Sequence, residues 1–157
     1  MSTLELPPSW PDTAPTEILP GLWQGGTSES SHLGMPTKAD HYRGKRPFDL
    51  IVTLYADAQP APWGVEEIRY GFPDGELKPR DLDRVRRIAA YAGRRWKAGD
   101  RVLIRCQAGV NRSGLVVGLV LREQGMSPST ALAHMRGARS AWVLSNEYFE
   151  AALMGEA

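Results

Sequence analysis

A cysteine and an arginine enclose five residues in the stretch 105–113, Arg-Cys-Gln-Ala-Gly-Val-Asn-Arg-Ser, which carries the clearest chemical signal in the chain. Cys106 ends a run that predicts a buried strand, and Arg112 begins a run that predicts a buried helix. A strand-to-helix turn of mostly small residues can point its backbone N–H groups inward at the helix start, where they bind anions. The residues expected to form this phosphate-binding loop are Gln107, Ala108, Gly109, Val110, Asn111 and Arg112.

Such a loop can combine phosphate binding with nucleophilic attack. The guanidinium of Arg112 can fork onto two phosphate oxygens, while Gly109 allows a backbone conformation that a Cβ would obstruct. The same positive field favours the thiolate of Cys106, which can attack phosphorus in line and form a phosphocysteine. We expect the hydroxyl of Ser113 to hydrogen-bond the departing thiolate. A buried core cysteine is the alternative, but it explains neither the arginine nor the serine.

This stretch resembles the signature loop of protein tyrosine phosphatases, Cys-x5-Arg-Ser/Thr, and most closely that of the dual-specificity phosphatases. The similarity extends from Ile18-Leu19-Pro20-Gly21-Leu22 to the C-terminal Arg139, Asn146, Phe149 and Leu153. It implies an α/β fold with a central, mostly parallel sheet flanked by helices. It implies no metal and no organic cofactor.

The resemblance also implies a general acid, because expulsion of an alkoxide or phenoxide requires a proton. The family supplies an aspartate from a mobile loop roughly thirty residues before the cysteine; Asp74 precedes Cys106 by 32 positions, in the loop Phe72-Pro73-Asp74-Gly75. Asp74 is therefore our candidate. Three other aspartates compete: Asp12 in the tripeptide Trp10-Pro11-Asp12, Asp81, which suits a helix cap, and Asp83, which suits a solvated helix face.

Two features bear on rate and substrate. Arg105 replaces the histidine that usually precedes the cysteine in the family, and it can support the thiolate only if its side chain folds toward the loop backbone. The loop interior contains no lysine, which disfavours phosphoinositides with their additional phosphates. One basic stretch of the chain is either a surface that steers phosphorylated partners or a solvated helix face; it comprises Arg84, Arg86, Arg87, Arg94, Arg95 and Lys97.

Periodicity predicts the elements that must position these residues. Alternation and apolar runs predict strands over 18–24, 48–55, 67–71 and 101–105, and helical spacing predicts helices over 79–97, 112–124, 127–136 and 146–154. Residues 1–17 are expected to be a proline-rich N-terminal arm, and 18–157 a single catalytic domain. Residues 27–47 are polar and give no assignment.

Composition limits the class of protein. The chain has 157 residues, of which 42% are hydrophobic and 24% charged, with a net charge of +1 and one cysteine. No intramolecular disulfide is possible, and neither a signal peptide nor an apolar membrane-spanning run is evident, so a cytoplasmic location is expected. The scattered histidines argue against a metal site.

The resulting functional hypothesis is hydrolysis of phosphotyrosine, with phosphoserine and phosphothreonine as further substrates. The expected partners are phosphorylated proteins or peptides, and inhibitory oxyanions such as phosphate, vanadate and sulfate; nucleic acids and membranes are not expected. The alternatives are a phosphatase for small molecules, lipids or RNA 5′ ends, a non-catalytic phosphate-binding module, and an arsenate reductase. The last usually needs further cysteines, which the chain lacks.

Overall fold

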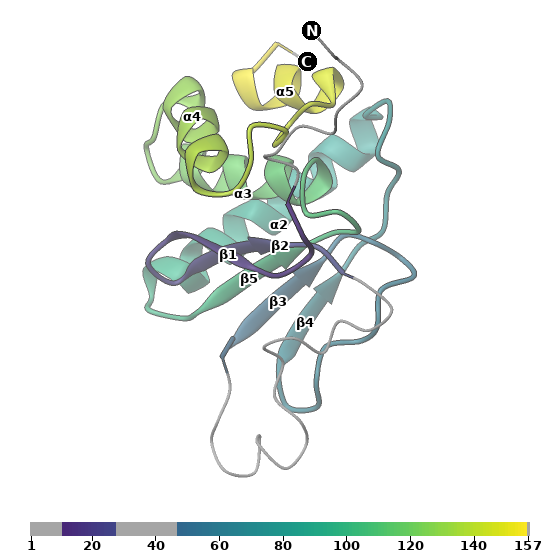
Figure 1. Ribbon diagram of the computed structural model, residues 1–157, viewed down its shortest axis with the longest axis vertical. Coiled ribbons are helices and arrows are strands. Elements are labelled where there is room, and N and C mark those ends of the chain that lie inside the picture. Colours follow the sequence, from purple (N-terminus) through teal and green to yellow (C-terminus); the bar gives the residue numbers. More distant parts are fainter. Residues whose placement is uncertain (1–10, 28–46, 157) are drawn as a thin grey trace, which may run out of the picture.

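A five-stranded sheet forms the centre of the computed structural model, which describes residues 11–27 and 47–156 (Figure 1). The strands lie in the order β1-β2-β5-β3-β4, and only β1 is antiparallel to its neighbour. Their bounds are β1 Thr16–Leu19, β2 Leu22–Gly25, β3 Leu50–Thr53, β4 Glu66–Arg69 and β5 Val102–Arg105. The predicted α/β fold with a mostly parallel sheet is confirmed.

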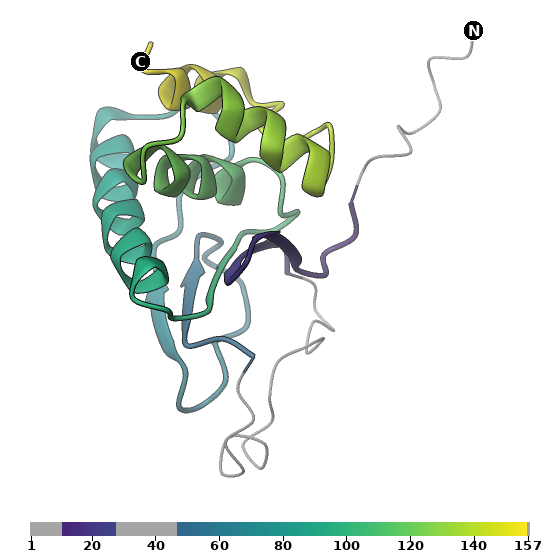
Figure 2. The ribbon, with the colours of Figure 1, turned by 90° about the vertical axis from the view of Figure 1, so that its left-hand side faces the viewer.

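Four helices cover one face of this sheet (Figure 2), and their bounds are α2 Pro79–Lys97, α3 Arg112–Glu123, α4 Pro128–Ala138 and α5 Glu147–Met154. Val52 and Ile104 of the central strands point into the main core beneath the helices. Their neighbours Ile51 and Leu103 point to the other face, as expected for alternating side chains, and form a smaller cluster with Phe48. Burial on both faces explains why β3 and β5 read as continuous apolar runs.

Helix α3 is the innermost helix. It packs against α2, α4, α5 and β5, and every residue from Arg112 to Leu121 is buried. Gly118 allows this close packing, because a Cβ at that position would lie 2.9 Å from a methyl group of Leu153 in α5. The start of α3, where the loop 107–111 ends, is therefore held by the core.

Local signals define the ends of the other helices. Pro79 occupies the first turn of α2, whose last turn carries Arg94, Arg95 and Lys97 next to the negative end of the helix dipole. The side chain of Ser127 caps α4 by accepting a hydrogen bond from the N–H of Thr130. These signals explain why the predicted helix 79–97 agrees with α2 at both ends.

The predicted single strand 18–24 is wrong, because this segment forms a hairpin. Pro20 and Gly21 turn the chain, with Gly21 at φ +85°, and β1 pairs antiparallel with β2. Strand β1 begins at Thr16, inside the segment expected to be an arm. Residues 1–10 of that arm, and 28–46 of the unassigned segment, lie outside the described residues.

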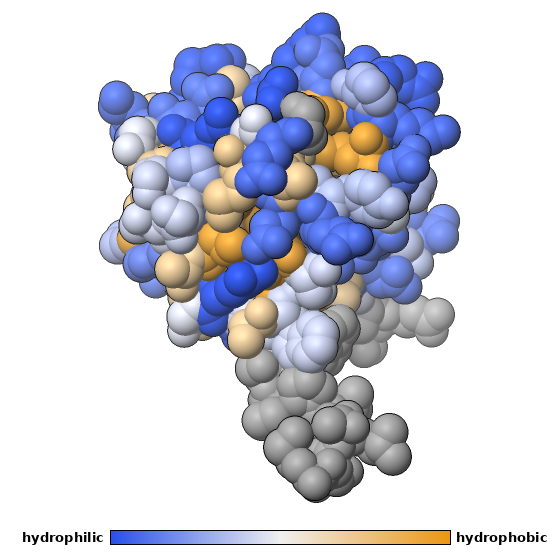
Figure 3. All heavy atoms as spheres, turned by 90° about the horizontal axis from the view of Figure 1, so that it is seen from above, coloured by the Kyte–Doolittle hydropathy of each residue, from blue (hydrophilic) through white to orange (hydrophobic). Residues whose placement is uncertain are grey.

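Polar residues dominate the surface seen in Figure 3, where apolar side chains emerge only in separate patches. Within residues 11–27 and 47–156, no helix combines the length and apolar character needed to cross a membrane.

A buried ionic network ties β5 to β3 and β4. Arg105 is only 3% exposed; its guanidinium donates to Thr53 Oγ1 at 3.0 Å, to the Gln59 carbonyl at 2.6 Å and to Glu67 Oε2 at 3.3 Å. Burial alone would raise the pKa of Glu67, but hydrogen bonds from Thr53 and the Ala61 N–H, with the charges of Arg69 and Arg105, hold that pKa below its ordinary value. Glu67 therefore stabilises the fold as a carboxylate.

We expect Glu67→Gln to lower the free energy of unfolding at neutral pH by about 3 kcal/mol, because it leaves the buried Arg105 without its counter-charge. The pKa of Glu67 is lower in the folded state than in the unfolded state. The carboxylate therefore contributes its full stabilisation at pH values above the unfolded-state pKa, and this stabilisation is lost as the pH falls through the folded-state pKa. Urea unfolding between about pH 3 and about pH 7 should therefore show a flatter pH dependence in the variant than in the wild type.

Glu66→Gln is the matched control on the same strand. Its carboxylate is half-exposed and pairs with Arg95 at the surface, so this variant should lose less than about 1 kcal/mol. Equal losses in the two variants would contradict a special contribution from the Arg105–Glu67 pair.

Candidate active site

Cys106 lies directly after β5, at the edge of the sheet where the parallel strands end. It is 2% exposed, its N–H donates to the Gly25 carbonyl at 3.2 Å, and its Sγ lies 3.3 Å from Ser113 Oγ. The hydroxyl predicted to contact the sulfur is therefore within hydrogen-bonding distance of it.

The carbonyl groups of the following loop point outward to partners in other parts of the chain. Gln107 O accepts a hydrogen bond at 2.9 Å and Val110 O at 3.3 Å, while Gly109 O accepts two, at 2.7 and 3.1 Å. The donors are the N–H groups of Thr27 and Leu144 and the side chains of Arg139 and Gln24. Turning these carbonyls outward directs the peptide N–H groups between them to the inside.

Those N–H groups have no acceptor in the part of the protein that the structure describes. Within the described ranges, none of the backbone N–H groups of residues 107–111 donates a hydrogen bond to another residue. Buried N–H groups are almost always paired in folded proteins, so a run of unpaired ones around a concave loop is typical of an anion site. The N-terminus of α3 adds its partial positive charge at the same place.

Arg112 closes the loop with a further unused donor. Its Nη1 donates to the Phe72 carbonyl at 3.0 Å, and its guanidinium carbon lies 5.3 Å from the centre of the Tyr55 ring. Its Nε is buried and has no partner in the part of the chain that the structure describes. Arg112 is only 9% exposed, and this buried donor is available to an external acceptor.

Two asparagines hold Asp74 beside this loop, and we call Asn111 and Asn146 the amide latch. Asn111 Nδ2 donates to one carboxylate oxygen at 3.1 Å and Asn146 Nδ2 to the other at 2.8 Å. Asn146 also donates to the Gly75 carbonyl at 3.0 Å, and its Oδ1 caps α5 by accepting from the Tyr148 N–H. The latch thus joins the loop of Asp74, the phosphate-binding loop and the start of α5.

The three competing aspartates lie in other surroundings. Asp12 accepts a hydrogen bond from the Ala14 N–H, and Asp83 forms an exposed ion pair with Arg87, as expected for a solvated face. The expectation that Asp81 caps α2 is wrong: the N-cap is Lys78, and Asp81 is buried one turn later, where it accepts a hydrogen bond from the hydroxyl of Tyr70.

The cation that contacts the loop is Arg139, not Arg105. Among the described residues, Arg105 donates to no atom of the loop, since Glu67 and Thr53 hold its guanidinium on the other strands. Arg139 binds the Gly109 carbonyl and, on the other side, the carbonyl groups of Asp12 and Ala14. Burial lowers the pKa of Arg139 and the charges of Cys106 and Asp12 oppose that shift, which places a second cation within electrostatic reach of the thiol.

Close backbone packing sets the path of the loop. Gly109 adopts φ +76°, and a Cβ there would lie 2.6 Å from backbone atoms of Gly25 and Gly26. A Cβ on Gly26 would in turn lie 2.7 Å from the Gln107 carbonyl oxygen. Only residues without a side chain fit at this contact between β2 and the loop.

Sequence reasoning named Cys106, Arg112, Ser113 and Asp74, and the structure brings them together around one loop. It assigned no role to Gln24, Tyr55, Arg139 or Asn146. The last two are among the residues that carry the family resemblance, which was the only signal available for them. In the described ranges, no group of three or more histidine, cysteine or acidic side chains is arranged to hold a metal ion.

Comparison with known proteins supports the fold. No protein-family model and no curated protein sequence matches the chain, but solved structures do. Human DUSP28 aligns with a TM-score of 0.71 at 23% identity, covering 96% of this chain and 94% of its own. A mouse putative dual-specificity phosphatase, complexed with zinc tungstate, aligns with a TM-score of 0.70 at 23% identity, covering 99% and 91%.

A third neighbour is the human tyrosine phosphatase-like serine/threonine/tyrosine-interacting protein, with a TM-score of 0.69 at 19% identity over 90% of this chain and 93% of its own. At these identities the likeness concerns the fold. The chain therefore has the fold of dual-specificity and tyrosine phosphatases over nearly its full length, as the resemblance of the loop implied.

We expect Gly109→Ala to destabilise the protein by at least about 2 kcal/mol, because the alanine meets both an unfavourable positive φ and a backbone clash. Gly99→Ala is the matched control, since Gly99 has φ +103° but nothing within 4 Å of the added Cβ. Urea unfolding of both variants separates the two costs. Equal losses of unfolding free energy in the two variants would show that the close packing of β2 against the loop contributes nothing to the cost of Gly109→Ala.

Proposed function

We propose that this chain is a cysteine-dependent phosphatase that hydrolyses phosphotyrosine in proteins or peptides. The observation that carries the proposal is that the N–H groups of residues 107–111 and the buried Nε of Arg112, which follow Cys106 in one loop, have no acceptor among the described residues. These donors suit a tetrahedral oxyanion, and a thiolate at its centre is a nucleophile.

In the first step, the Cys106 thiolate attacks phosphorus on the side opposite the leaving oxygen. A sulfur–phosphorus bond forms as the phosphorus–oxygen ester bond breaks, and Asp74 donates its proton to the departing oxygen. Arg112 and the N–H groups of the loop bind the equatorial oxygens, whose charge they stabilise in the transition state.

In the second step, water attacks the phosphocysteine. Asp74, now a carboxylate, takes a proton from this water as the sulfur–phosphorus bond breaks, which regenerates the acid and releases phosphate. The hydroxyl of Ser113, 3.3 Å from Sγ, donates a hydrogen bond to the departing thiolate and lowers the barrier to its release.

The substrate class rests on the loop and on the neighbours of the fold. Gln107 to Asn111 contain no lysine to meet the additional phosphates of a phosphoinositide. The mouse neighbour carries tungstate, an oxyanion of the shape that we propose for this loop. Phosphoserine and phosphothreonine are proposed as further substrates, residues 18–157 as the catalytic domain, and the reducing cytoplasm as the compartment that keeps Cys106 a free thiol.

Cys106→Ser is expected to reduce hydrolysis of p-nitrophenyl phosphate by at least about 10⁴-fold, because an alcohol at the same position is a far weaker nucleophile. Binding of tungstate or phosphate, measured by calorimetry, should persist because its donors are retained. Turnover that survives this substitution would rule out the phosphocysteine route. A wild type that binds the oxyanion but hydrolyses no phosphoester would instead be a binding module.

Asp74→Asn is expected to lower kcat/KM for phenyl phosphate by about a hundredfold or more. The loss should be smaller for p-nitrophenyl phosphate, whose leaving group needs less help from an acid. The decline of the wild-type rate at alkaline pH should also disappear. Equal losses with both esters, and an unchanged pH profile, would show that another group protonates the leaving oxygen.

The amide latch is expected to position Asp74, and Asn146→Asp tests this role. Aspartate can still cap α5 but offers no N–H to the Asp74 carboxylate. We expect kcat for phenyl phosphate to fall about tenfold with little change in KM, because a misplaced acid slows the chemical step but leaves substrate binding unchanged.

Asn146→Ala separates positioning from stability. It should show the same fall in kcat and also lose about 1 kcal/mol of folding stability with the cap. Full activity in Asn146→Asp would contradict the role of the latch.

A further inference from the structure

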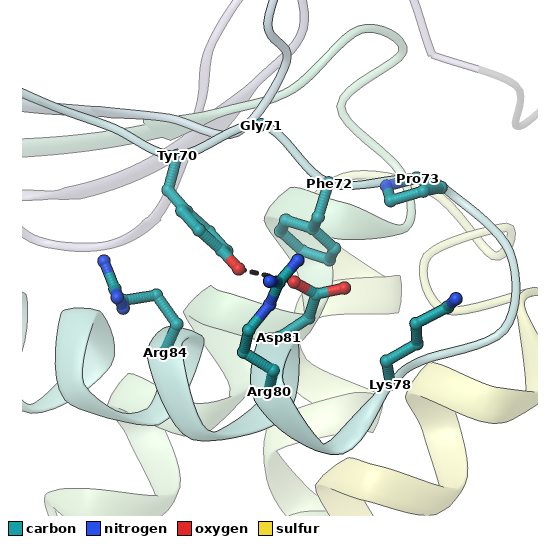
Figure 4. Close-up of a pocket in the computed structure, with 8 residues that line it drawn as sticks. All are labelled: Tyr70, Gly71, Phe72, Pro73, Lys78, Arg80, Asp81 and Arg84. Atoms are coloured by element: carbon teal, nitrogen blue, oxygen red, sulfur yellow. Dashed lines mark hydrogen bonds between the residues drawn. The ribbon is translucent and has the colours of Figure 1, made fainter.

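A second hollow opens beside the first turns of α2, and its chemistry differs from that of the Cys106 loop. It encloses about 430 Å³ between α2 and the segment 70–73. Figure 4 shows Arg80 and Arg84 on the first turns of α2 and Lys78 just before this helix; all three side chains line the hollow.

These three cations have no acidic partner among the described residues. Other arginines of the same helix do: Arg87 pairs with Asp83, and Arg95 with both Glu66 and Asp100. The broad basic surface suggested by the sequence is therefore partly neutralised. One residue of that stretch, Arg84, lines this hollow together with Lys78 and Arg80.

The one acidic residue of the hollow is already engaged. Asp81 is 6% exposed and accepts a hydrogen bond from the Tyr70 hydroxyl, as Figure 4 shows. This bond raises the pKa of Tyr70, so the phenol stays protonated and bound to Asp81. Arg84 lies over the same ring, with its guanidinium carbon 5.3 Å from the ring centre.

The start of α2 adds to the positive field. Its N-cap residue, Lys78, contributes no side-chain acceptor to the first-turn N–H groups. An uncapped helix start carries a partial positive charge and unpaired donors, and both attract anions. Three cations, a helix start and a concave surface together favour a carboxylate or a phosphate as the occupant.

The hollow and the Cys106 loop share a wall. Phe72 borders the hollow, and its carbonyl accepts the hydrogen bond of Arg112; Pro73 continues from it into Asp74. The segment 72–73 therefore adjoins both the hollow and the side chain of Arg112.

We propose that this hollow is a specificity subsite that binds an acidic side chain, or a second phosphate, of the phosphorylated peptide whose phosphotyrosine lies over Cys106. The inference rests on the proposed function, and it adds a substrate class: phosphopeptides with negative charge beside the phosphotyrosine. Lys78, Arg80 and Arg84 supply the donors, and the segment 72–73 separates the two anionic groups.

The test compares phosphotyrosine peptides of equal length that are neutral, carry glutamates on the N-terminal or C-terminal flank, or carry a second phosphate on either flank. With the wild type, an acidic peptide should be hydrolysed about fivefold faster than the neutral one in kcat/KM. The double variant Arg80→Gln/Arg84→Gln should abolish this ratio. The control Arg86→Gln, which removes a charge from α2 beside the separate hollow formed with Arg122, should retain it.

Binding of the same peptides to the Cys106→Ser variant, followed by fluorescence anisotropy, separates this inference from the proposed function. If the chain hydrolyses none of the peptides, a preference for acidic ones that disappears in the Arg80→Gln/Arg84→Gln background still supports the subsite. Equal rates and equal affinities for neutral and acidic peptides would overturn it, as would the same loss in Arg86→Gln. If only the doubly phosphorylated peptides are preferred, the natural occupant is a phosphate. If the glutamate peptides are preferred as well, the hollow also accepts an acidic side chain.

Discussion

The arrangement around Cys106 depends on hydrogen bonds that hold the carbonyl groups of one loop, whose own N–H groups donate to no other described residue. Unpaired buried N–H groups are costly, so a loop in this state needs anchors that prevent it from collapsing onto its own donors. The anchors come from three distant places: Gln24 on β2, Thr27 just beyond it, and the segment after α4 that carries Arg139 and Leu144. The buried helix α3 holds the far end. Much of the fold thus supports one short loop.

Two arginines, Arg105 and Arg139, place their positive charges in different parts of the structure, and their positions in the sequence did not indicate which one contacts the loop. Arg105, next to Cys106 in the chain, points along the sheet to Glu67 and Thr53 and stabilises the strands. Arg139, far away in sequence, binds the loop carbonyl of Gly109 and the residues that lead into β1. A side chain in a strand alternates direction with its neighbours, so adjacency to Cys106 by itself turns Arg105 to the opposite face of the sheet. The cation beside the thiol therefore comes from another element.

The sequence predicted the features that depend on neighbouring residues, such as helix ends and the contiguous loop motif. It missed the features that arise only from contacts between distant segments. Helix α2 agrees at both ends because apolar periodicity, Pro79 and the glycine after the helix are all local signals. Cys106, Arg112 and Ser113 were recognised because they are contiguous. The hairpin of β1 and β2 was missed because pairing, not composition, distinguishes two short strands from one. Gln24, Arg139 and Asn146 were given no role because an isolated polar residue carries no mark of the loop that it contacts after folding.

The most direct test of the central claim is to trap the covalent intermediate. Wild-type protein mixed with an aryl phosphate and quenched in acid within milliseconds should carry one phosphoryl group, located on Cys106 by mass spectrometry of its peptides. The label should accumulate further in the Asp74→Asn variant if that aspartate also activates the attacking water. Turnover without any phosphoryl group on Cys106, under conditions that preserve a phosphocysteine standard, would contradict the account and point to direct attack by water.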